Sequence, residues 1–400
     1  MRSVALSFAE ARRLVVETVR AAPTPKPVEE VALLEAPGRV LAEPLAADRD
    51  LPPVARSIRD GFAVRAADLP GELTLVGEVR AGTVFEGAVQ SGQAVEIMTG
   101  APLPVGADAV VMLEHAVREG DRVRIERTVE PGEFINPQGA EARRGDVLLC
   151  PGTRLGFAQI ALAASIGRTK LRVFRLPTVA ILPTGDEIVP VEATSPEPYQ
   201  VRNSNAYSLA VQVARAGGRP QRLDVARDDL DETRRLVESG LQADLLLLSG
   251  GVSAGKYDVV ERVLSDLGAE FYFDRVLIQP GQPLVFGRVG GVFFFGLPGN
   301  PASTMVTFEL FARAALELLA GVEEPALSFF RVPLAEDFRH RPGLTRFLPA
   351  RLSSDGRRLR PIPWRGSSDL PAMARANAWL VADAGREYWR AGEPIEVFLP

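Results

Sequence analysis

The segment from Ser249 to Asp258 brings glycines, hydroxyl groups and a carboxylate together in one short stretch. It follows an apolar run, 244–248, that is typical of a buried strand. Its glycines, among them Gly250 and Gly251, let backbone N–H groups approach a phosphate, and the helix expected next presents a positive N-terminal end. Asp258 stands at the start of that helix, as a metal ligand or as an ordinary N-cap. We interpret the segment as a loop that handles phosphate and metal.

Two further loops follow expected strands of the same region. The first, Pro183–Glu187, comes after the apolar run 179–182, and its Asp186 and Glu187 are hard oxygen ligands suited to Mg²⁺. The second, Gly296–Pro301, holds two prolines and two glycines directly before an expected helix. Because the carboxyl ends of parallel strands meet at one edge of a sheet, we expect the three loops to converge on one ligand. Taken singly, each also fits an ordinary polar or rigid turn.

Two stretches nearer the N-terminus carry further candidate groups. The first is 57–63, which contains Asp60 before a glycine, and the second is 96–104, which contains Thr99 before a glycine. Both Asp-Gly and Thr-Gly are common in bare turns. Residue chemistry alone therefore does not make either one catalytic.

The scarcity of cysteine and histidine restricts the chemistry. Cys150 is the single cysteine, and His115 and His340 are the only histidines, which argues against a disulfide framework, a multi-cysteine metal site and a multi-histidine site. A net charge of -5 argues against a general nucleic-acid binder. We see neither a signal peptide nor an apolar run of the ~18 residues that span a bilayer, so we expect a cytoplasmic protein that does not enter the membrane. Catalysis would then rest on carboxylates, amides, hydroxyls, backbone N–H groups and a hard metal ion.

Strand and helix patterns alternate through the middle of the chain. The expected strands are 179–182, 222–225, 244–248 and 292–295, and the expected helices are 204–216, 228–240, 258–267 and 302–319. Alternation of elements of this length predicts an α/β domain with a mostly parallel sheet and helices on both faces.

The remaining segments have a different texture. Short β-like runs separated by Gly and Pro fill 45–139, and a second set of β runs fills the C-terminal part. A helix over 3–20 is expected to pack with a strand and a helix near 145–170. The predicted fold class is multidomain α/β and β. The four predicted domains are a discontinuous linker domain (1–44 plus 140–173), a small β-rich domain (45–139), the α/β domain (174–324) and a C-terminal β-barrel-like domain (325–400).

The motifs together resemble the MoeA family of molybdopterin molybdenumtransferases, which is related to the C-terminal region of eukaryotic gephyrin. The resemblance extends over essentially the whole chain, and it rests on five motifs in family order: Asp60–Ala63, Ile97–Pro102, Thr184–Glu187, Ser249–Ser253 and Gly296–Pro301. It implies that the α/β domain is of the molybdopterin-binding type. It also implies an elongated four-domain subunit in a homodimer.

The resemblance further implies a reaction and a set of residues. Molybdate is inserted into the dithiolate of adenylylated molybdopterin, AMP is released, and Mg²⁺ assists. The active site of the family lies between the α/β domain of one subunit and the small β domain of its partner. Carried over by motif, the catalytic residues are Asp60, Thr99 and Asp258, the metal ligands are Glu187, Asp228 and Asp258, and the substrate-binding residues are Gly250, Gly251, Ser253, Gln279, Gln282, Pro298, Pro301 and Ser367.

This chain departs from the family pattern where the oxyanion is expected to bind. The family usually has Lys-Pro-Gly-Lys-Pro, whereas residues 279–283 read Gln-Pro-Gly-Gln-Pro. Hydrogen bonds to charged groups contribute about 1.5–3 kcal/mol, against about 0.5–1.5 kcal/mol for neutral ones. Either Arg59 and Lys256 replace the lost charge, so that activity survives with altered oxyanion selectivity, or the protein is a paralogue that binds the pterin and inserts metal weakly or not at all. Changing Gln279 and Gln282 to lysine is therefore expected to tighten molybdate binding.

Three classes of function compete. The first is a transferase of molybdenum cofactor assembly, with an unknown preference between molybdate and tungstate. The second is a carrier that binds the pterin, and the third is a scaffold by analogy with gephyrin. Retention of Asp60, Glu187, Asp228 and Asp258 favours catalysis, because four carboxylates do not help to bind a polyanion unless a cation joins them.

Overall fold

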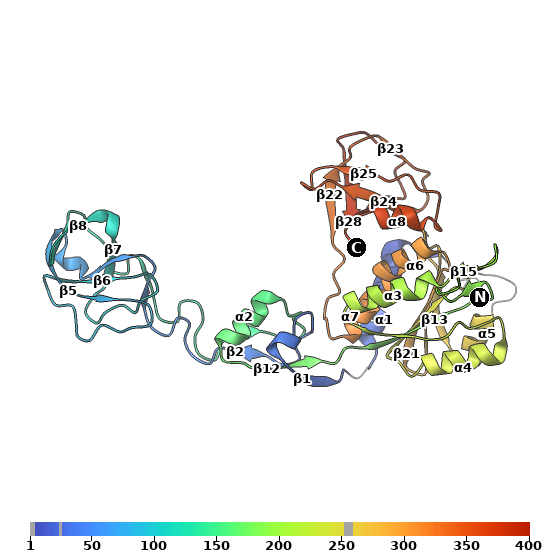
Figure 1. The fold of residues 1–400 in the computed structure, drawn as a ribbon, viewed down its shortest axis with the longest axis horizontal. Coiled ribbons are helices and arrows are strands. Elements are labelled where there is room, and N and C mark those ends of the chain that lie inside the picture. Colours follow the sequence, from blue (N-terminus) through green and yellow to red (C-terminus); the bar gives the residue numbers. More distant parts are fainter. Residues whose placement is uncertain (1–4, 24–25, 252–258) are drawn as a thin grey trace. The chain divides into compact units, whose positions relative to one another are not determined.

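The computed structural model describes residues 5–23, 26–251 and 259–400, and the chain forms two compact units (Figure 1). The large unit comprises residues 1–30, 38–42 and 172–400, and the small unit comprises residues 31–37 and 43–171. The four-domain division stays a prediction. The N-terminal helix, which was expected to pack with a strand and a helix near 145–170, instead packs in the core of the large unit. Across the described ranges, no helix is both long enough and apolar enough to cross a membrane.

The centre of the large unit is a mixed sheet of six strands within the described residues. Its order is β16 (Arg219–Arg222), β13 (Thr178–Pro183), β17 (Leu245–Ser249), β21 (Val292–Leu297), β20 (Pro283–Val289) and β18 (Glu270–Arg275). The first four strands are parallel, and the last two are antiparallel to their neighbours. The predicted, mostly parallel α/β sheet is therefore confirmed.

Helices cover both faces of this sheet (Figure 1). One face carries α1 (Phe8–Ala21), α3 (Ser204–Arg215), α6 (Pro301–Thr307) and α7 (Arg313–Leu319), and the other carries α4 (Leu230–Gly240) and α5 (Val259–Asp266). Successive side chains of a strand point to opposite faces, so Leu245 and Leu247 of β17 enter the first core. Leu246 and Leu248 enter the second. The continuous apolar run of β17 follows from this burial on both sides.

Several element boundaries differ from those expected. The first helix was predicted from residue 3, but it begins at Phe8 because Ser7 forms a capping box with Glu10. The helix predicted from residue 228 begins at Leu230 because the Asp229 carboxylate accepts the Glu232 N–H at 2.8 Å.

The second strand of the predicted alternation was also misplaced. It was expected at 222–225, but β16 pairs Arg219–Arg222 with Thr178–Ile181 of β13. The pairing begins directly after the Gly217-Gly218 turn that ends α3, so polar residues form the strand and the apolar run follows it. The helix predicted at 302–319 is interrupted by a π-helical segment, η4 (Phe308–Ala312).

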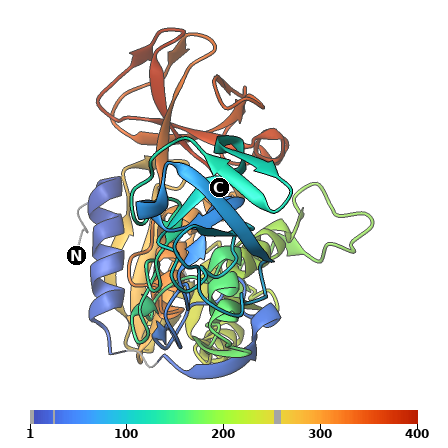
Figure 2. The ribbon, with the colours of Figure 1, turned by 90° about the vertical axis from the view of Figure 1, so that its left-hand side faces the viewer.

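A second sheet, at the C-terminal end of the chain, belongs to the same unit and lies at one end of it in both views (Figures 1 and 2). Its order is β19 (Ile278–Gln279), β24 (Thr345–Leu352), β26 (Ala378–Ala382), β28 (Pro394–Phe398) and β22 (Phe329–Pro333), with β25 (Leu359–Pro361) paired to β24. Phe347, Trp379 and Phe398 join the core of the α/β sheet, while the other face closes over a core of its own. A short pair, β23 (Phe338–Arg339) and β27 (Tyr388–Trp389), and helix α8 (Leu370–Arg375) complete this part.

The small unit is built on an open sheet. The order is β7 (Ala109–Met112), β4 (Gly61–Val64), β6 (Gln93–Ile97), β5 (Gly71–Val79), β9 (Arg122–Ile125) and β8 (Ala116–Glu119). The unit also contains β2 (Leu45–Ala46), β3 (Arg56–Ser57), β10 (Ile135–Asn136), β11 (Val147–Leu149) and α2 (Phe157–Ser165). The β-rich character expected here is confirmed, and β1 (Val28–Ala32) and β12 (Lys170–Phe174) straddle the boundary of the units.

Candidate active site

The three predicted loops begin side by side at the carboxyl edge of the α/β sheet. The Thr184 N–H donates to the Ser249 carbonyl at 3.1 Å, so the loop after β13 is tied to the end of β17. The Gly250 N–H donates to the Leu297 carbonyl at 3.1 Å, which ties the loop after β17 to the end of β21. The convergence expected from the sequence is thus present in the backbone.

The first two glycines of the central loop are required by close packing. Gly250 has φ +99°, and a Cβ placed on it would lie 2.7 Å from the Thr184 carbonyl oxygen. Gly251 has φ +60°, and its Cβ would lie 2.7 Å from the Thr184 Oγ1 atom. Any larger residue would push the loop away from the strand end. Ser253 and Asp258 lie outside the described residues, and their roles stay predictions.

Two buried polar atoms at this edge lack a hydrogen-bond partner among the described residues. They are the Oγ1 atom of Thr184 and the Oδ1 atom of Asn205. The Nδ2 group of Asn205 donates to the Gly299 carbonyl at 2.8 Å, which places this amide against the third loop. Buried polar atoms normally find partners, so unpaired ones beside three loops are typical of a ligand site.

Asn205 was missed in the sequence analysis. A signal was available, because an Asn-Ser-Asn run opens a helix that directly follows the short strand β15 (Val201–Arg202). Asn203 is the N-cap of α3 and accepts the Ala206 N–H at 3.2 Å. Asn205, the second asparagine of the run, lies within the first turn of α3 and does not serve as its N-cap, so its side chain contacts the third loop.

The third loop is held in shape by its own helix. The Thr304 N–H and Oγ1 group both donate to the Asn300 carbonyl, at 3.0 and 3.1 Å, and Oγ1 also donates to the Pro298 carbonyl. Pro301 occupies the first turn of α6, where its missing N–H costs nothing. Within the described residues the Asn300 side chain makes no cap hydrogen bond. The loop is therefore tied to the start of α6, and its role as a wall of the pocket stays a prediction.

The remaining predicted substrate-binding residues of the large unit lie in two loops that pack on α6, one at its start and one near its end. The Ala302 N–H donates to the Ser367 carbonyl at 3.0 Å. Gly281, between Gln279 and Gln282, has φ +105°, and a Cβ on it would lie 2.4 Å from the Thr307 Cγ2 atom. The Gln279–Gln282 loop and the Ser367 loop thus both pack on this helix.

Two predicted metal ligands lie in neighbouring loops at the same edge. The Asp186 carboxylate accepts the Asp228 N–H at 3.1 Å, and the Asp186 carbonyl accepts a guanidinium N–H of Arg227 at 2.8 Å. The Glu187 carboxylate folds back over Gly185, where an added Cβ would lie 2.4 Å from its Oε2 atom. Glu187 and Asp228 are both exposed.

The carboxylates of Glu187 and Asp228 have the chemistry of an Mg²⁺ site, since this ion takes oxygen ligands and keeps several waters. No group of three His, Cys, Asp or Glu residues that could hold a metal occurs in the described ranges. The third predicted ligand, Asp258, lies outside those ranges, so the full ligand set stays a prediction.

Asp60 and Thr99 contact each other in the small unit. The Thr99 N–H and Oγ1 group both donate to Asp60 Oδ1, at 2.7 and 2.8 Å. These two bonds hold the pKa of the exposed Asp60 carboxyl below its ordinary value, and the bond from the Thr99 N–H has the larger effect. Gly61 is needed for spacing, because a Cβ on it would lie 1.9 Å from the Val111 carbonyl of the next strand. The pair presents a permanently ionised carboxylate at neutral pH.

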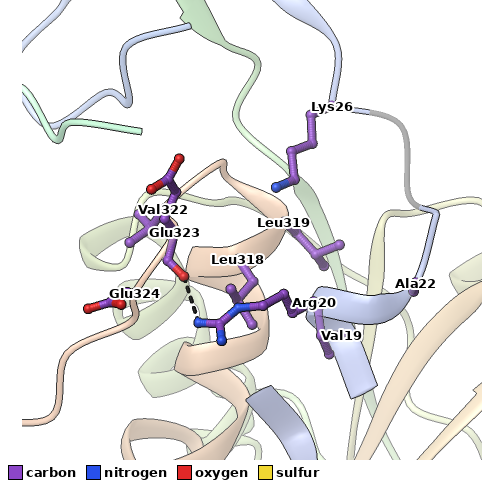
Figure 3. Close-up of a pocket in the computed structure, with 9 residues that line it drawn as sticks. All are labelled: Val19, Arg20, Ala22, Lys26, Leu318, Leu319, Val322, Glu323 and Glu324. Atoms are coloured by element: carbon purple, nitrogen blue, oxygen red, sulfur yellow. Dashed lines mark hydrogen bonds between the residues drawn. The ribbon is translucent and has the colours of Figure 1, made fainter. Parts of the chain in front are cut away.

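Two cavities of the large unit differ in their relation to these loops. One, of about 370 Å³, lies between α1 and α7 and is lined by Val19, Leu318 and Leu319, with Arg20 donating to the Glu323 carbonyl at 2.8 Å (Figure 3). None of the predicted site residues lines it. The other, of about 640 Å³, is lined by Trp364–Arg365 and Ser368–Asp369, on both sides of Ser367, and therefore adjoins the candidate site.

Comparison with known proteins gives consistent matches along the chain. Family models match residues 6–167 (MoeA N-terminal region, domains I and II), 180–318 (probable molybdopterin binding domain) and 331–399 (MoeA C-terminal region, domain IV). The molybdopterin molybdenumtransferase of Bacillus subtilis is 35% identical over 385 residues, which cover 93% of this chain and 89% of that protein. That of Staphylococcus epidermidis is 33% identical over 379 residues, covering 92% and 90%.

Solved structures agree with the sequence relatives. A crystal structure of the molybdopterin biosynthesis MoeA protein from Pyrococcus horikoshii OT3 superposes with a TM-score of 0.82. Its sequence identity is 30%, and the alignment covers 99% of this chain and 100% of that one.

Proposed function

Because this chain belongs to the MoeA family of molybdopterin molybdenumtransferases, we propose that it acts in molybdenum cofactor biosynthesis. In the proposed reaction it inserts molybdate into the dithiolate of adenylylated molybdopterin and releases AMP. The observation that carries the proposal for this chain is the convergence of the loops after β13, β17 and β21, with the buried Thr184 Oγ1 and Asn205 Oδ1 atoms unpaired beside them.

The proposed roles follow from the chemistry of each loop. The Gly250-Gly251 turn and the start of α6 offer backbone N–H groups to the phosphates of the substrate. Gln279, Gln282 and Ser367 bind the oxyanion, with Ser253 in the central loop, while Pro298 and Pro301 keep the wall of the pocket rigid. These polar groups bind and orient two anions, so little proton transfer by histidine is needed.

Mg²⁺ is proposed to be held by Glu187 and Asp228, together with Asp258. When bound, the ion would neutralise charge on the phosphates and make AMP a better leaving group. Asp186 positions Asp228, because the Asp186 carboxylate accepts the Asp228 N–H. Asp228→Asn is therefore expected to abolish Mg²⁺-dependent AMP release while the fold stays intact.

The protein is proposed to work as a homodimer. In this arrangement Asp60 and Thr99 of a second copy complete each site from the partner's small unit. An ionised Asp60 would act there either on bound water or on the hydration shell of the metal.

The test is AMP release by the purified chain. Adenylylated molybdopterin is incubated with Mg²⁺ and molybdate, and AMP is quantified over time. We expect release that requires both molybdate and Mg²⁺, and loss of release in Asp228→Asn. The control is Asp231→Asn, which removes a carboxylate from the first turn of α4 and should release AMP normally. No metal-dependent release with molybdate or tungstate, despite tight pterin binding, would replace the transferase by a carrier.

A further inference from the structure

We propose that Arg346 provides the positive charge of the oxyanion site, acting beside Gln279 from the neighbouring strand β24. The inference rests on the proposed function, because it names the residue that selects and holds the anion within the same site. Gln279 and Gln282 contribute only neutral amide donors, so a doubly charged tetrahedral anion would otherwise meet no cation in that loop.

The strand pairing places the two side chains together. β19 and β24 are parallel, and their register pairs Ile278 with Thr345 and Gln279 with Arg346. Paired residues on neighbouring strands project from the same face, about 4.8 Å apart. Ile278 and Phe347 point into the large apolar core, so the alternation sends Gln279 and Arg346 to the opposite face.

One nitrogen of the Arg346 guanidinium, Nε, is buried without a hydrogen-bond partner among the described residues. Arg346 as a whole is half-buried. Its two ladder neighbours are Gln279 and Ala382, neither of which carries a negative charge. A shielded N–H donor without an acceptor is costly, and an anion would relieve that cost.

The chemistry of arginine matches a tetrahedral oxyanion. Its planar fork donates two parallel N–H bonds to two oxygens of one anion, which lysine cannot do. The neighbouring amide of Gln279 would add a further donor from the same face.

The position of Arg346 also fits the candidate site. β19 leads directly into the Gly281 turn, which packs against Thr307 of α6. The start of α6 is the element that the Ser367 loop also contacts. Of the cations considered from the sequence, Arg59 belongs to the small unit and Lys256 lies outside the described residues. Arg346 is a cation in the same unit as the glutamine loop.

The experiment measures molybdate binding by calorimetry on the full-length protein, at two salt concentrations. We expect Arg346→Gln to weaken binding by roughly 10–100-fold, because a charged fork is replaced by a neutral amide. Arg351→Gln is the matched control, since Arg351 lies on the same strand, is exposed and donates to the Arg375 carbonyl. It should bind molybdate like the wild type.

A rescue separates an electrostatic role from a structural one. Adding Gln279→Lys to Arg346→Gln returns a positive charge to the same face from the adjacent strand and should recover at least part of the affinity. A purely structural role of Arg346 predicts the same gain when Gln279→Lys is made in the wild-type protein, whereas a shared anion site predicts a larger gain in the Arg346→Gln background. Should Arg346→Gln fail to fold, Arg346→Met is used instead, because it keeps an apolar stem and removes the buried Nε group.

The outcomes distinguish this inference from the proposed function. Unchanged molybdate affinity in a folded Arg346→Gln or Arg346→Met protein overturns the inference, even where AMP release stands. Loss of affinity, with a larger gain from Gln279→Lys in the Arg346→Gln background than in the wild type, supports the anion site, even where no AMP release is found in the wild type. Loss of affinity, with no larger gain from Gln279→Lys in the Arg346→Gln background than in the wild type, assigns Arg346 a structural role and also overturns the inference.

Discussion

The Asp60–Thr99 pair shows how a single contact decides the state of an exposed carboxylate. Two hydrogen bonds from one threonine favour the ionised form and hold the pKa of Asp60 below its ordinary value. A lowered folded-state pKa stabilises the fold above the unfolded-state pKa, and this contribution is lost as the pH falls through the folded-state pKa. The stabilising contribution of the Asp60–Thr99 contact is therefore lost only at acid pH.

Thr99→Val tests the hydroxyl part of this contact. The variant keeps the backbone N–H donor and loses the Oγ1 donor, so the pKa of Asp60 should rise toward its ordinary value without fully reaching it. Carboxyl carbon NMR over an acid titration measures the shift. Thr83→Val is the control, because the Thr83 hydroxyl bonds to the backbone N–H and carbonyl of the nearby Arg80 and not to a carboxylate. An unchanged Asp60 titration would show that the hydroxyl bond does not form in solution.

Gly281 shows how the shape of the oxyanion loop depends on one residue. Gly281→Ala should destabilise the large unit and weaken molybdate binding, because its Cβ would lie 2.4 Å from Thr307 Cγ2 and displace the loop from α6. Gly343→Ala is a matched control with a similar φ, +106° against +105°, and open space around the added Cβ. The difference between the two in unfolding free energy should be about 1–3 kcal/mol, measured by denaturant titration. Equal losses would mean that backbone strain, rather than the clash, decides the effect.

At the scale of elements, the π-helical segment Phe308–Ala312 depends on an arginine from another helix. Arg12 of α1 donates to the carbonyls of Leu310 and Pro325. Burial, followed by repulsion from Arg313, lowers the pKa of Arg12 to about 10, so the group remains charged at neutral pH. A π turn leaves carbonyls without their usual helical partners, and Arg12 satisfies one of them.

Removing this arginine tests the dependence. Arg12→Met should lower the free energy of unfolding by about 1.5–3 kcal/mol, because two carbonyls lose charged donors. Arg13→Met, at the exposed neighbouring position, should change it little. Denaturant unfolding followed by far-UV circular dichroism measures both. Equal stability of the two variants would show that water replaces Arg12 at these carbonyls.

At the scale of the whole molecule, the candidate groups are divided between two units. Asp60 and Thr99 belong to the small unit, whereas Glu187, Asp228 and the glutamine loop belong to the large one. A homodimer that shares its sites would let each chain supply one half of each site.

Mixing two inactive variants tests this sharing. Asp60→Asn and Asp228→Asn should each be inactive alone, and their heterodimers would hold one intact site and one doubly altered site. After unfolding and joint refolding in equal amounts, AMP release should return to roughly a quarter of the wild-type rate, since half of the dimers are mixed and each has one working site. Separately refolded variants, combined afterwards without exchange, are the control. A site built within one chain would give no recovery.

Local sequence patterns were sufficient to predict much of the α/β fold and the loops at its sheet edge. The apolar run of β17, the glycines after it and the proline-rich loop before α6 predicted a parallel sheet with converging loops, because strand ends and helix starts depend on neighbouring residues. Small errors arose where one capping residue decided a boundary, as Ser7 and Asp229 did.

The amino-acid sequence by itself thus determined the alternation of strands and helices and the family motifs, because both depend on the periodicity and spacing of residues close together in the chain. The tertiary structure alone decided which distant residues meet. The pairing of Gln279 with Arg346, the contact of Asn205 with Gly299 and the bond from Arg12 to Leu310 each join residues far apart in the chain. Such contacts depend on strand register and helix packing, which no local pattern encodes.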